Sequence, residues 1–332
     1  MKKFIFSILI LILFFKLSYS DEITKITYAS SNSSSGLTQI FVMDEDGSNK
    51  KQITNLPTNC KYPRWSPDGK NIVFQTDDYR IFFIKDANTD NPEEPYFVFG
   101  GSHPSFTGID DEIMFNNDHE GFFSIYIMLP TDPEAYLVSD IGYSNQQVLS
   151  DDGTELVFSA IYEGAKSIFV MNLEDTTDNN IEIVSFNNNA NIEPDISSDS
   201  KMFVYASFND QLKGTIYIYK DGKETALTKS IPSSNQPEFS PEDDKIGFIT
   251  INDENTKLYI MDLDGSNKEE IKVIGGNVGR IKWLDNERIL YDAESSNESV
   301  VGIVNIETGK CVALADDGIN MTPDFVKIVV RN

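Results

Sequence analysis

The sequence predicts an all-β protein, a β-propeller of four-stranded antiparallel blades, and three observations support this fold class. A motif recurs along the chain with a period typical of propeller blades. The middle strands of the repeat are apolar on both faces, and each end of the chain carries strands that the other end lacks. The 332 residues are 40% hydrophobic and include 22 Phe and 14 Tyr, which suffices for a large core and excludes a disordered chain.

The repeat is clearest at residues 63–74, which read PRWSPDGKNIVF and close on an aromatic residue. Degenerate copies of this segment close on the aromatic residues Phe115, Phe158, Tyr205, Phe248 and Tyr291. The closing aromatics are 41, 43, 47, 43 and 43 residues apart. Repeats of about 40 to 45 residues with four strands each are the sequence signature of propeller blades.

Each repeat predicts four strands joined by hairpins. The inner strand carries a Pro-x-aromatic-Ser pattern, and in its turn Pro67 presets φ while Gly69 accepts a left-handed φ. An apolar third strand, such as residues 39–43, and a short outer strand, such as 52–54, follow. Middle strands such as 246–251 are apolar on both faces. Stacked blades cover both faces of a sheet, whereas a sandwich leaves one face wet.

The two ends of the chain predict a shared closing blade. Three strands, at residues 26–30, 39–43 and 52–54, precede the first inner strand, and one inner strand, at 322–326, follows the sixth repeat. Joining them gives a seventh blade and removes the open edges of the ring. We therefore predict one propeller domain over residues 21–332 with seven blades; six or eight stay open because the repeats are degenerate.

Residues 1–20 have the features of a secretory signal peptide. Lys2 and Lys3 precede an apolar stretch at 4–15, and a small-x-small site at 18–20 ends before Asp21. An uncleaved membrane anchor is the alternative, but this stretch is shorter than the about 20 apolar residues that span a bilayer. We expect an extracytoplasmic protein, secreted or periplasmic, with no membrane span after signal cleavage.

The mature chain is strongly acidic. Loss of the signal lowers the basic count from 27 to 24 against 53 acidic residues, a net charge of −29. Such a surface repels phosphates, so we predict no nucleic-acid partner. The acids are scattered through predicted turns, and solubility is their simplest explanation; binding of cations or basic partners is the alternative.

These motifs resemble a known family. The run WSPDG at residues 65–69, and Tyr-x-Met-Asp-x-Asp-Gly at 259–265, are similar to the WD40-like (PD40) repeats of TolB-like propellers. They also resemble the propellers of dipeptidyl-peptidase IV-type proteins and of oligogalacturonate lyases. The resemblance covers essentially 21–332 and implies a fold rather than a function. TolB has an additional α/β domain ahead of its propeller, and this sequence enters its strands directly, so we do not expect TolB-type docking of a lipoprotein.

The sequence contains few candidates for catalysis. Gly-x-Ser-x-Gly, His-Glu-x-x-His, Gly-x-Gly-x-x-Gly and phosphate-loop motifs are absent. The lyase resemblance implies a histidine-rich metal site, for which His103 and His119 with Asp118 or Glu120 are the only candidates. Catalytic zinc normally has three protein ligands. We predict no catalytic residue, metal or cofactor, and keep a metal-dependent polysaccharide lyase or hydrolase as the alternative.

Two further motifs have simpler explanations. The Asp-x-Asp-Gly-Ser-Asn segments at 44–49 and 262–267 resemble part of a calcium loop. They lack its twelve-residue spacing and final Glu, and a turn alone explains their glycines. The sequons at Asn32, Asn297 and Asn320 matter only if the source organism glycosylates exported proteins.

The candidate ligand site is the residue just before each Pro-x-aromatic motif, where the inner strand enters the central channel. These positions, which we call the mouth ring, are Tyr62, His103, Gln146, Glu193, Gln236, Arg280 and Thr322. The side chain two positions further, Arg64 in the first repeat, is predicted to continue down the same wall. Arg280, placed opposite Glu193, Tyr62 and His103, is suited to orienting a polar or anionic group. A water-filled lining without a ligand is the alternative.

The motif's aromatic position stays apolar and is predicted to be core between blades. It is occupied by Trp65, Phe106, Leu149, Ile196, Phe239, Trp283 and Phe325. We therefore interpret the chain as an exported, monomeric, non-enzymatic binding or scaffold propeller. Its channel mouth, together with the loop at residues 118–121, is predicted to face a protein or glycan partner.

The two cysteines are predicted to be free thiols. Cys60 enters the first inner strand, whereas Cys311 follows a turn at the opposite face of the ring. A disulfide needs Cα atoms within about 7 Å. Alkylation of the denatured protein without reductant should therefore add two groups by intact-mass measurement, and an unmodified mass would contradict this.

Overall fold

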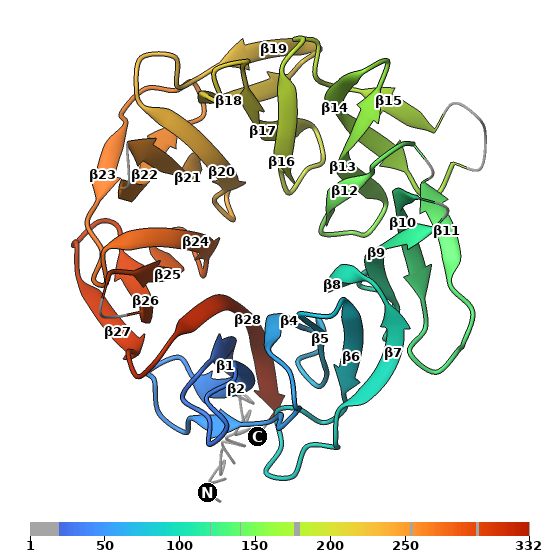
Figure 1. The fold of residues 1–332 in the computed structure, drawn as a ribbon. Coiled ribbons are helices and arrows are strands. Elements are labelled where there is room, and N and C mark those ends of the chain that lie inside the picture. Colours follow the sequence, from blue (N-terminus) through green and yellow to red (C-terminus); the bar gives the residue numbers. More distant parts are fainter. Residues whose placement is uncertain are drawn as a thin grey trace, which may run out of the picture.

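The computed structural model describes residues 20–119, 121–139, 141–175, 180–252, 255–296 and 299–331. Its strands form seven four-stranded antiparallel sheets arranged in a ring around a central channel (Figure 1), which confirms the predicted fold class and blade count. Among the described residues, no helix is long and apolar enough to cross a membrane. The predicted signal peptide lies outside the described residues except for Ser20, and Glu120 and Asn297 lie outside them too.

Six blades are built from consecutive strands, with the inner strand first and the outer strand last. Blade 1 consists of β4 (Cys60–Trp65), β5 (Ile72–Thr76), β6 (Arg80–Ile84) and β7 (Tyr96–Gly100), and blade 2 of β8 (Ser102–Phe106), β9 (Ile113–His119), β10 (Phe122–Met128) and β11 (Tyr136–Ser139). Blade 3 consists of β12 (Asn145–Leu149), β13 (Glu155–Tyr162), β14 (Ala165–Asn172) and β15 (Ile181–Ile183), and blade 4 of β16 (Ala190–Ile196), β17 (Met202–Phe208), β18 (Gly214–Lys220) and β19 (Lys223–Ala226). Blade 5 consists of β20 (Ser233–Phe239), β21 (Lys245–Asn252), β22 (Asn255–Asp262) and β23 (Glu269–Ile271), and blade 6 of β24 (Asn277–Trp283), β25 (Arg288–Glu294), β26 (Ser299–Asn305) and β27 (Cys311–Ala315).

Blade 7 closes the ring with strands from both ends of the chain, as predicted. Its order is β28 (Asn320–Arg331), β1 (Ser20–Ser30), β2 (Gln39–Asp44) and β3 (Lys51–Gln52). The pairing of β28 with β1 runs from Ser20↔Arg331 to Ser30↔Asn320, so it extends beyond the predicted strands on both sides. The extended part of β28 also packs on the turn of blade 1. Ile328 lies so close to Gly69 that a Cβ at this position would be 2.6 Å from Ile328 Cγ1, so only glycine fits there.

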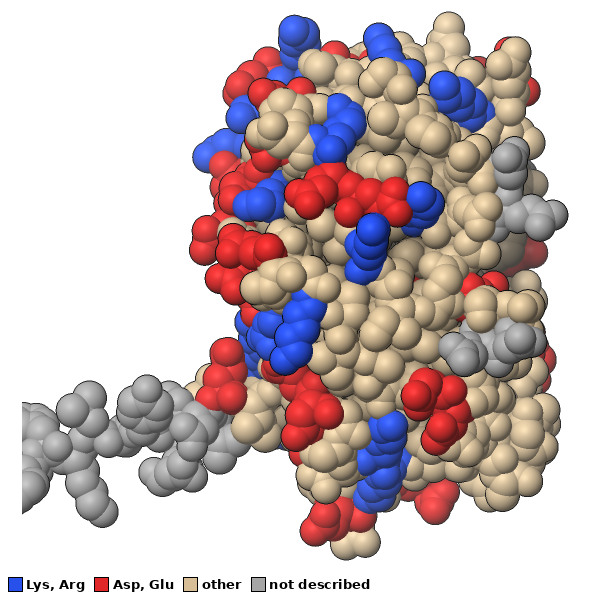
Figure 2. Space-filling view, turned by 90° about the vertical axis from the view of Figure 1, so that its left-hand side faces the viewer, with Lys and Arg blue, Asp and Glu red and all other residues tan. Residues whose placement is uncertain are grey.

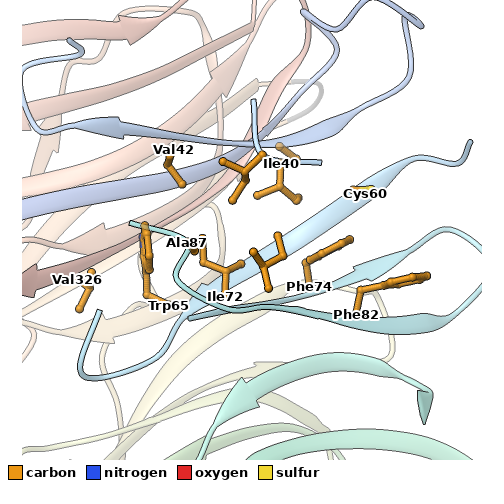
Figure 3. Close-up of a cluster of buried hydrophobic side chains, with 12 residues drawn as sticks. Ile40, Val42, Cys60, Trp65, Ile72, Phe74, Phe82, Ala87 and Val326 are labelled. Carbon is orange, nitrogen blue, oxygen red and sulfur yellow. The ribbon is translucent and has the colours of Figure 1, made fainter. Parts of the chain in front are cut away.

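The core lies between neighbouring blades. Where blade 7 meets blade 1, Ile40 from β2 and Ile72 and Phe74 from β5 pack in one buried cluster with Trp65 and Val326 (Figure 3). Every residue of β5 is buried, so both faces of this middle strand contribute, at roughly 1.5–3 kcal/mol for each large apolar side chain.

The predicted aromatic core positions differ in burial. Trp65, Ile196, Phe239 and Trp283 are buried, whereas the side chains of the other three are only partly buried. These three, Phe106, Leu149 and Phe325, pack against the edges of core clusters. The prediction that all seven positions are core is therefore correct for four of them and too strong for the rest.

The Ser-Pro-Asp-Gly turn is held by its own side chains. The Ser66 hydroxyl donates to Asp68 Oδ1 at 2.7 Å and accepts from the Asn71 N–H at 2.9 Å, and Gly69 has φ of +69°. Ser150 and Ser197 make equivalent pairs of bonds in blades 3 and 4. The repeated Ser and Asp therefore serve the fold and not a ligand.

The cysteines and sequons are also placed by the fold. Both cysteines are free; Cys60 is buried in the cluster of blades 7 and 1, and burial raises its pKa to about 12. Asn320 is 1% exposed, and its amide donates to the Ser299 carbonyl at 3.0 Å. A side chain buried in this way is no glycan acceptor in the folded protein.

Deletion of residues 321–332 should abolish cooperative unfolding. It removes the partner of β1 along most of its length and uncovers the apolar contacts of Val326. Urea unfolding followed by circular dichroism and tryptophan fluorescence measures this, with Val329→Ser, at a site 59% exposed on the same strand, as the control that keeps the wild-type transition. An unchanged transition in the truncated protein would contradict ring closure by β28.

Candidate functional site

The inner strands enclose a channel cavity of about 270 Å³. Every predicted mouth-ring residue except Thr322 lines this cavity: Tyr62, His103, Gln146, Glu193, Gln236 and Arg280. Thr322 is only 5% exposed, and its hydroxyl is directed to the backbone of blade 1 instead. The structure therefore brings the predicted ring together at one end of the channel and removes one member from the wall.

The mouth ring is built on a backbone feature that the sequence did not reveal. Tyr62, His103, Gln146, Glu193, Gln236 and Thr322 have left-handed φ values between 49° and 55°. Each lies at a β-bulge, where the register between inner and second strand shifts by one residue. A left-handed non-glycine residue costs on the order of 1 kcal/mol or more, so the fold must stabilise these residues elsewhere.

Hydrogen bonds between blades supply that stabilisation. The backbone N–H that the bulge frees from the sheet donates to an acceptor side chain of the preceding blade. The pairs are Tyr62 N–H to Thr322 Oγ1 (3.2 Å), His103 N–H to Gln75 Oε1 (2.6 Å), Glu193 N–H to Gln146 Oε1 (3.1 Å) and Gln236 N–H to Glu193 Oε2 (2.9 Å). Thr322, Gln146 and Glu193 thus join the blades, and Gln146 and Glu193 also line the channel.

Arg280 departs from this pattern. It pairs with Asp292 in the ladder of β24 with β25, and the bulge falls on Gly279 instead. Its guanidinium lies 4.9 Å from the centre of the Tyr62 ring, and Tyr62 and His103 have ring centres 5.5 Å apart. Arg280 was predicted to lie opposite Tyr62, but it makes a cation–π contact with the Tyr62 ring instead. It can reach across blade 7 because the residue of that blade at this level, Thr322, is small and buried.

A second level of side chains, polar except for Val148, continues down the channel, as the position of Arg64 predicted. Its members, two positions further along each inner strand, are Arg64, Ser105, Val148, Asp195, Glu238 and Lys282 on the wall, with Asp324 buried behind it. Lys282 Nζ lies 3.5 Å from Glu238 Oε1. Of these residues only Arg64 was predicted, although the same two-residue offset along each inner strand identifies all the others.

Burial controls the ionisation of the channel. It raises the pKa of Glu193 and of Asp195, and the charge of Glu238 raises the pKa of Asp195 further. Burial also lowers the pKa of His103, and the charges of Arg280, Arg64 and Lys61 lower it more. The His103 imidazole is therefore neutral at neutral pH unless a nearby negative charge is introduced.

The other predicted candidates contribute less. Within the described ranges, no three His, Cys, Asp or Glu side chains lie together as metal ligands would, and the side chain of His119 lies outside them. In the two Asp-x-Asp-Gly-Ser-Asn turns, Asn49 and Asn267 each donate to the first Asp at 2.7 Å, so these carboxylates hold their own turns. Asp118, in the predicted 118–121 loop, lines a second cavity of about 390 Å³ beside Tyr79 and Phe123.

The face around the channel mouth is rich in exposed apolar side chains. The loops at this end present what we call the apolar rim: Tyr79, Phe123, Tyr143, Ile161, Tyr162, Phe186, Leu212, Ile274 and Ile319. Leu212 is 79% exposed and Phe186 64%. The turns of the opposite face carry acidic runs such as 242–244. The side view in Figure 2 shows Lys, Arg, Asp and Glu gathered towards that opposite face.

Comparisons with known proteins find one family and several distant relatives. The family model described as the TolB β-propeller domain matches residues 18–285. An uncharacterised protein of Agrobacterium fabrum is 23% identical over 68% of this chain and 80% of its own length. The Tol-Pal system protein TolB of Francisella tularensis is 23% identical over 78% of this chain, which spans only 59% of that protein.

Solved structures agree on the fold. The β-propeller domain of the Trilobed protease from Pyrococcus furiosus superposes with a TM-score of 0.62 at 14% identity, covering 91% of this chain and 96% of that one. That domain is described as having an open velcro topology, whereas the ring here is closed by the pairing of β28 with β1. At such low identity the likeness shows the fold alone.

Asp292 predicts a loss of stability as the pH rises. Burial raises its pKa to about 6, although Arg280 and the Thr322 N–H oppose this. The folded protein therefore keeps a proton that the unfolded chain releases near the ordinary pKa. This contribution to the free energy of unfolding is complete below that ordinary value and disappears as the pH rises through about 6.

Urea unfolding between pH 4 and 8 measures this effect. In Asp292→Asn the fall in unfolding free energy across this range should be smaller than in the wild type by roughly 2 kcal/mol. Asp210→Asn, at an exposed site, is the control for loss of a carboxyl and should keep the wild-type profile. Parallel profiles for wild type and Asp292→Asn would show that Asp292 does not cause the dependence.

Proposed function

Since this chain belongs to the TolB β-propeller family, we propose that it is an extracytoplasmic binding protein that recognises a protein partner at its channel mouth and catalyses no reaction. The N-terminal Lys-apolar-small pattern of residues 1–20 supports export. The Francisella relative is named as a component of the Tol-Pal system, which supports a role in a protein assembly. A monomer is the simplest form of such a module.

The observation that carries the proposal is the apolar rim. Exposed aromatic and aliphatic side chains from several blades surround the mouth, and the side view shows charged side chains of both signs gathered towards the opposite face. Exposed apolar groups bordered by polar ones are typical of protein interaction sites. Aromatic side chains are also enriched at the energetic centres of interfaces.

The mouth ring supports binding in a second way. Two of the side chains that line it, Gln146 and Glu193, are fixed by hydrogen bonds between blades, such as Gln236 N–H to Glu193 Oε2 at 2.9 Å. A surface fixed before the partner arrives loses little conformational entropy on binding. The loops of seven blades therefore present a broad, pre-organised face to a folded or extended polypeptide.

Replacing two rim tyrosines should abolish partner binding without unfolding the propeller. Tyr79 is 63% exposed and Tyr162 47%, so Tyr79→Ser/Tyr162→Ser should change the unfolding free energy by less than about 1 kcal/mol. Immobilised wild-type protein is used to capture proteins from an envelope extract of the source organism, and captured proteins are quantified by mass spectrometry. We expect at least one protein to be retained by the wild type and reduced about ten-fold by the double variant.

The matched control lies on the outer circumference. Phe97 and Tyr136, on the outer strands of blades 1 and 2, are 53% and 56% exposed, and Phe97→Ser/Tyr136→Ser should capture the wild-type set. If both double variants retain the same proteins, the mouth is not the interface. The wild type and the two double variants are also tested on a glycan array. Binding of glycans without capture of any protein would reject a protein partner.

A further inference from the structure

Two arginines of the channel make no ion pair at hydrogen-bonding distance, although the charge of Arg280 acts on Asp292 and Glu193. No ion pair in the described part of the chain includes Arg64 or Arg280. Arg64 Nη1 donates to the neighbouring Pro63 carbonyl at 3.0 Å, and Arg280 stacks on Tyr62. A guanidinium has five N–H donors, so most donors on both side chains are left without a protein acceptor.

The carboxylates of the channel do not take up these donors, because each is held by another group. Glu238 pairs with Lys282, and the others accept backbone N–H groups of the next blade. These acceptor contacts are Glu193 with the Gln236 N–H (2.9 Å), Asp195 with the Phe239 N–H (2.8 Å) and Asp324 with the Trp65 N–H (2.9 Å). The two arginines are therefore not required to neutralise an acid at hydrogen-bonding distance.

Arg64 and Arg280 act on the same part of the cavity. Both line it, and Arg64 follows Tyr62 by two residues on β4, so it continues the wall on which Arg280 stacks. Their charges also lower the pKa of the same group, His103. We call Arg64, Arg280, Tyr62 and His103 the arginine pocket.

We propose that the arginine pocket binds the C-terminal carboxylate of a polypeptide that enters the channel end-on from the mouth face. This inference rests on the proposed function, since it names what a protein partner would insert. A planar carboxylate matches the fork of a guanidinium and accepts two parallel hydrogen bonds from it. Arg64 and Arg280 together provide more donors than one carboxylate can accept.

The surroundings fit a chain end better than a folded domain. A cavity of about 270 Å³ admits a few residues, while the apolar rim lies outside it, where the preceding residues of the partner would pack. The net charge of the chain is negative, but charges further away than about 10 Å are largely screened at physiological salt. The N–H donors of Arg64 and Arg280 therefore contribute more to carboxylate binding than the net charge of the chain does.

His103 makes this testable, because the chain contains only two histidines and its imidazole signals are easily assigned with a His119→Gln variant. The charged groups acting on His103 are Arg280, Arg64 and Lys61, and all lower its pKa. A carboxylate bound beside it should shift its NMR signals and raise its pKa, since a nearby negative charge favours the imidazolium form.

The experiment titrates the full chain with three probes and follows His103 by NMR. The probes are acetyl-trialanine with a free C-terminal carboxylate, the same peptide as its C-terminal amide, and acetate. We expect the free peptide to bind at least ten-fold more tightly than either other probe. Equal affinity for the peptide and its amide would overturn the carboxylate site, and equal affinity for peptide and acetate would overturn the chain-end assignment.

Variants then locate the site. Arg280→Gln and Arg64→Gln should each weaken peptide binding at least ten-fold, and Arg280→Lys should recover part of it, because it restores charge without the planar fork. Arg80→Gln, which removes an arginine paired with Asp78 in the rim loop, is the matched control and should bind normally. Retained binding in Arg280→Gln overturns the proposal, and this variant alone decides if Arg64→Gln does not fold.

The same protein separates this inference from the proposed function. Tyr79→Ser/Tyr162→Ser should lose the captured partner but keep the His103 response to the tripeptide, which is too short to reach the rim. If Arg280→Gln loses the His103 response but captures the partner normally, the partner does not insert its C-terminal carboxylate into the arginine pocket; this rejects the inference and leaves the proposed function standing. A normal response with no rim-dependent capture rejects only the proposed function.

Discussion

The pairing of β1 with β28 is the interaction on which the rest of the structure depends. It joins the first and last strands and places blade 7 between blades 6 and 1. From β28, Thr322 and Asp324 accept the backbone N–H groups of Tyr62 and Trp65, so closure also fixes the start of blade 1. Arg280 of blade 6 reaches Tyr62 of blade 1 because the blade 7 residue between them, Thr322, is small and buried.

The left-handed residues explain why part of the polar ring at the mouth serves the fold itself. Each bulge frees a backbone N–H, and a neighbouring side chain must accept it, which favours Thr, Gln or Glu at those positions. Thr322, Gln146 and Glu193 meet this requirement. Tyr62, His103 and Arg280 supply no such acceptor, and they are the members that gather beside Arg64. The ring residues that accept N–H groups between blades are therefore different from those that we propose for recognition.

The architecture could be predicted because the repeats and the number of strands at each end of the chain can be read directly from the sequence. Three strands before the first inner strand and one after the sixth repeat gave seven blades, which the structure confirms. The sequence did not predict the bulges, since a residue before proline is normally extended and the left-handed state of Tyr62 or His103 depends on an acceptor in another blade. The sequence also did not predict that β1 begins at Ser20, because residues 21–25 are mostly polar.

The site was predicted in part for the same reason. A period of two placed Arg64 below Tyr62 on one wall. The stacking of Arg280 required knowing that Thr322 is buried rather than in the channel. Burial of Asp195 and Glu238 likewise depends on neighbouring blades. The hydrogen bonds and ion pairs of these carboxylates form only in the assembled ring, so the sequence alone could not predict them.

Ring closure also sets the order of events in folding. β1 is synthesised before the other strands of the ring and its partner β28 after them, so the edge of β1 that pairs with β28 stays open until β28 has been made. Contacts between residues so distant in sequence form slowly, because the loop between them must lose much of its freedom. During that interval an unpaired strand edge and apolar blade faces are exposed to other chains. The step that gives the finished ring its integrity is therefore also the step at which aggregation competes with folding.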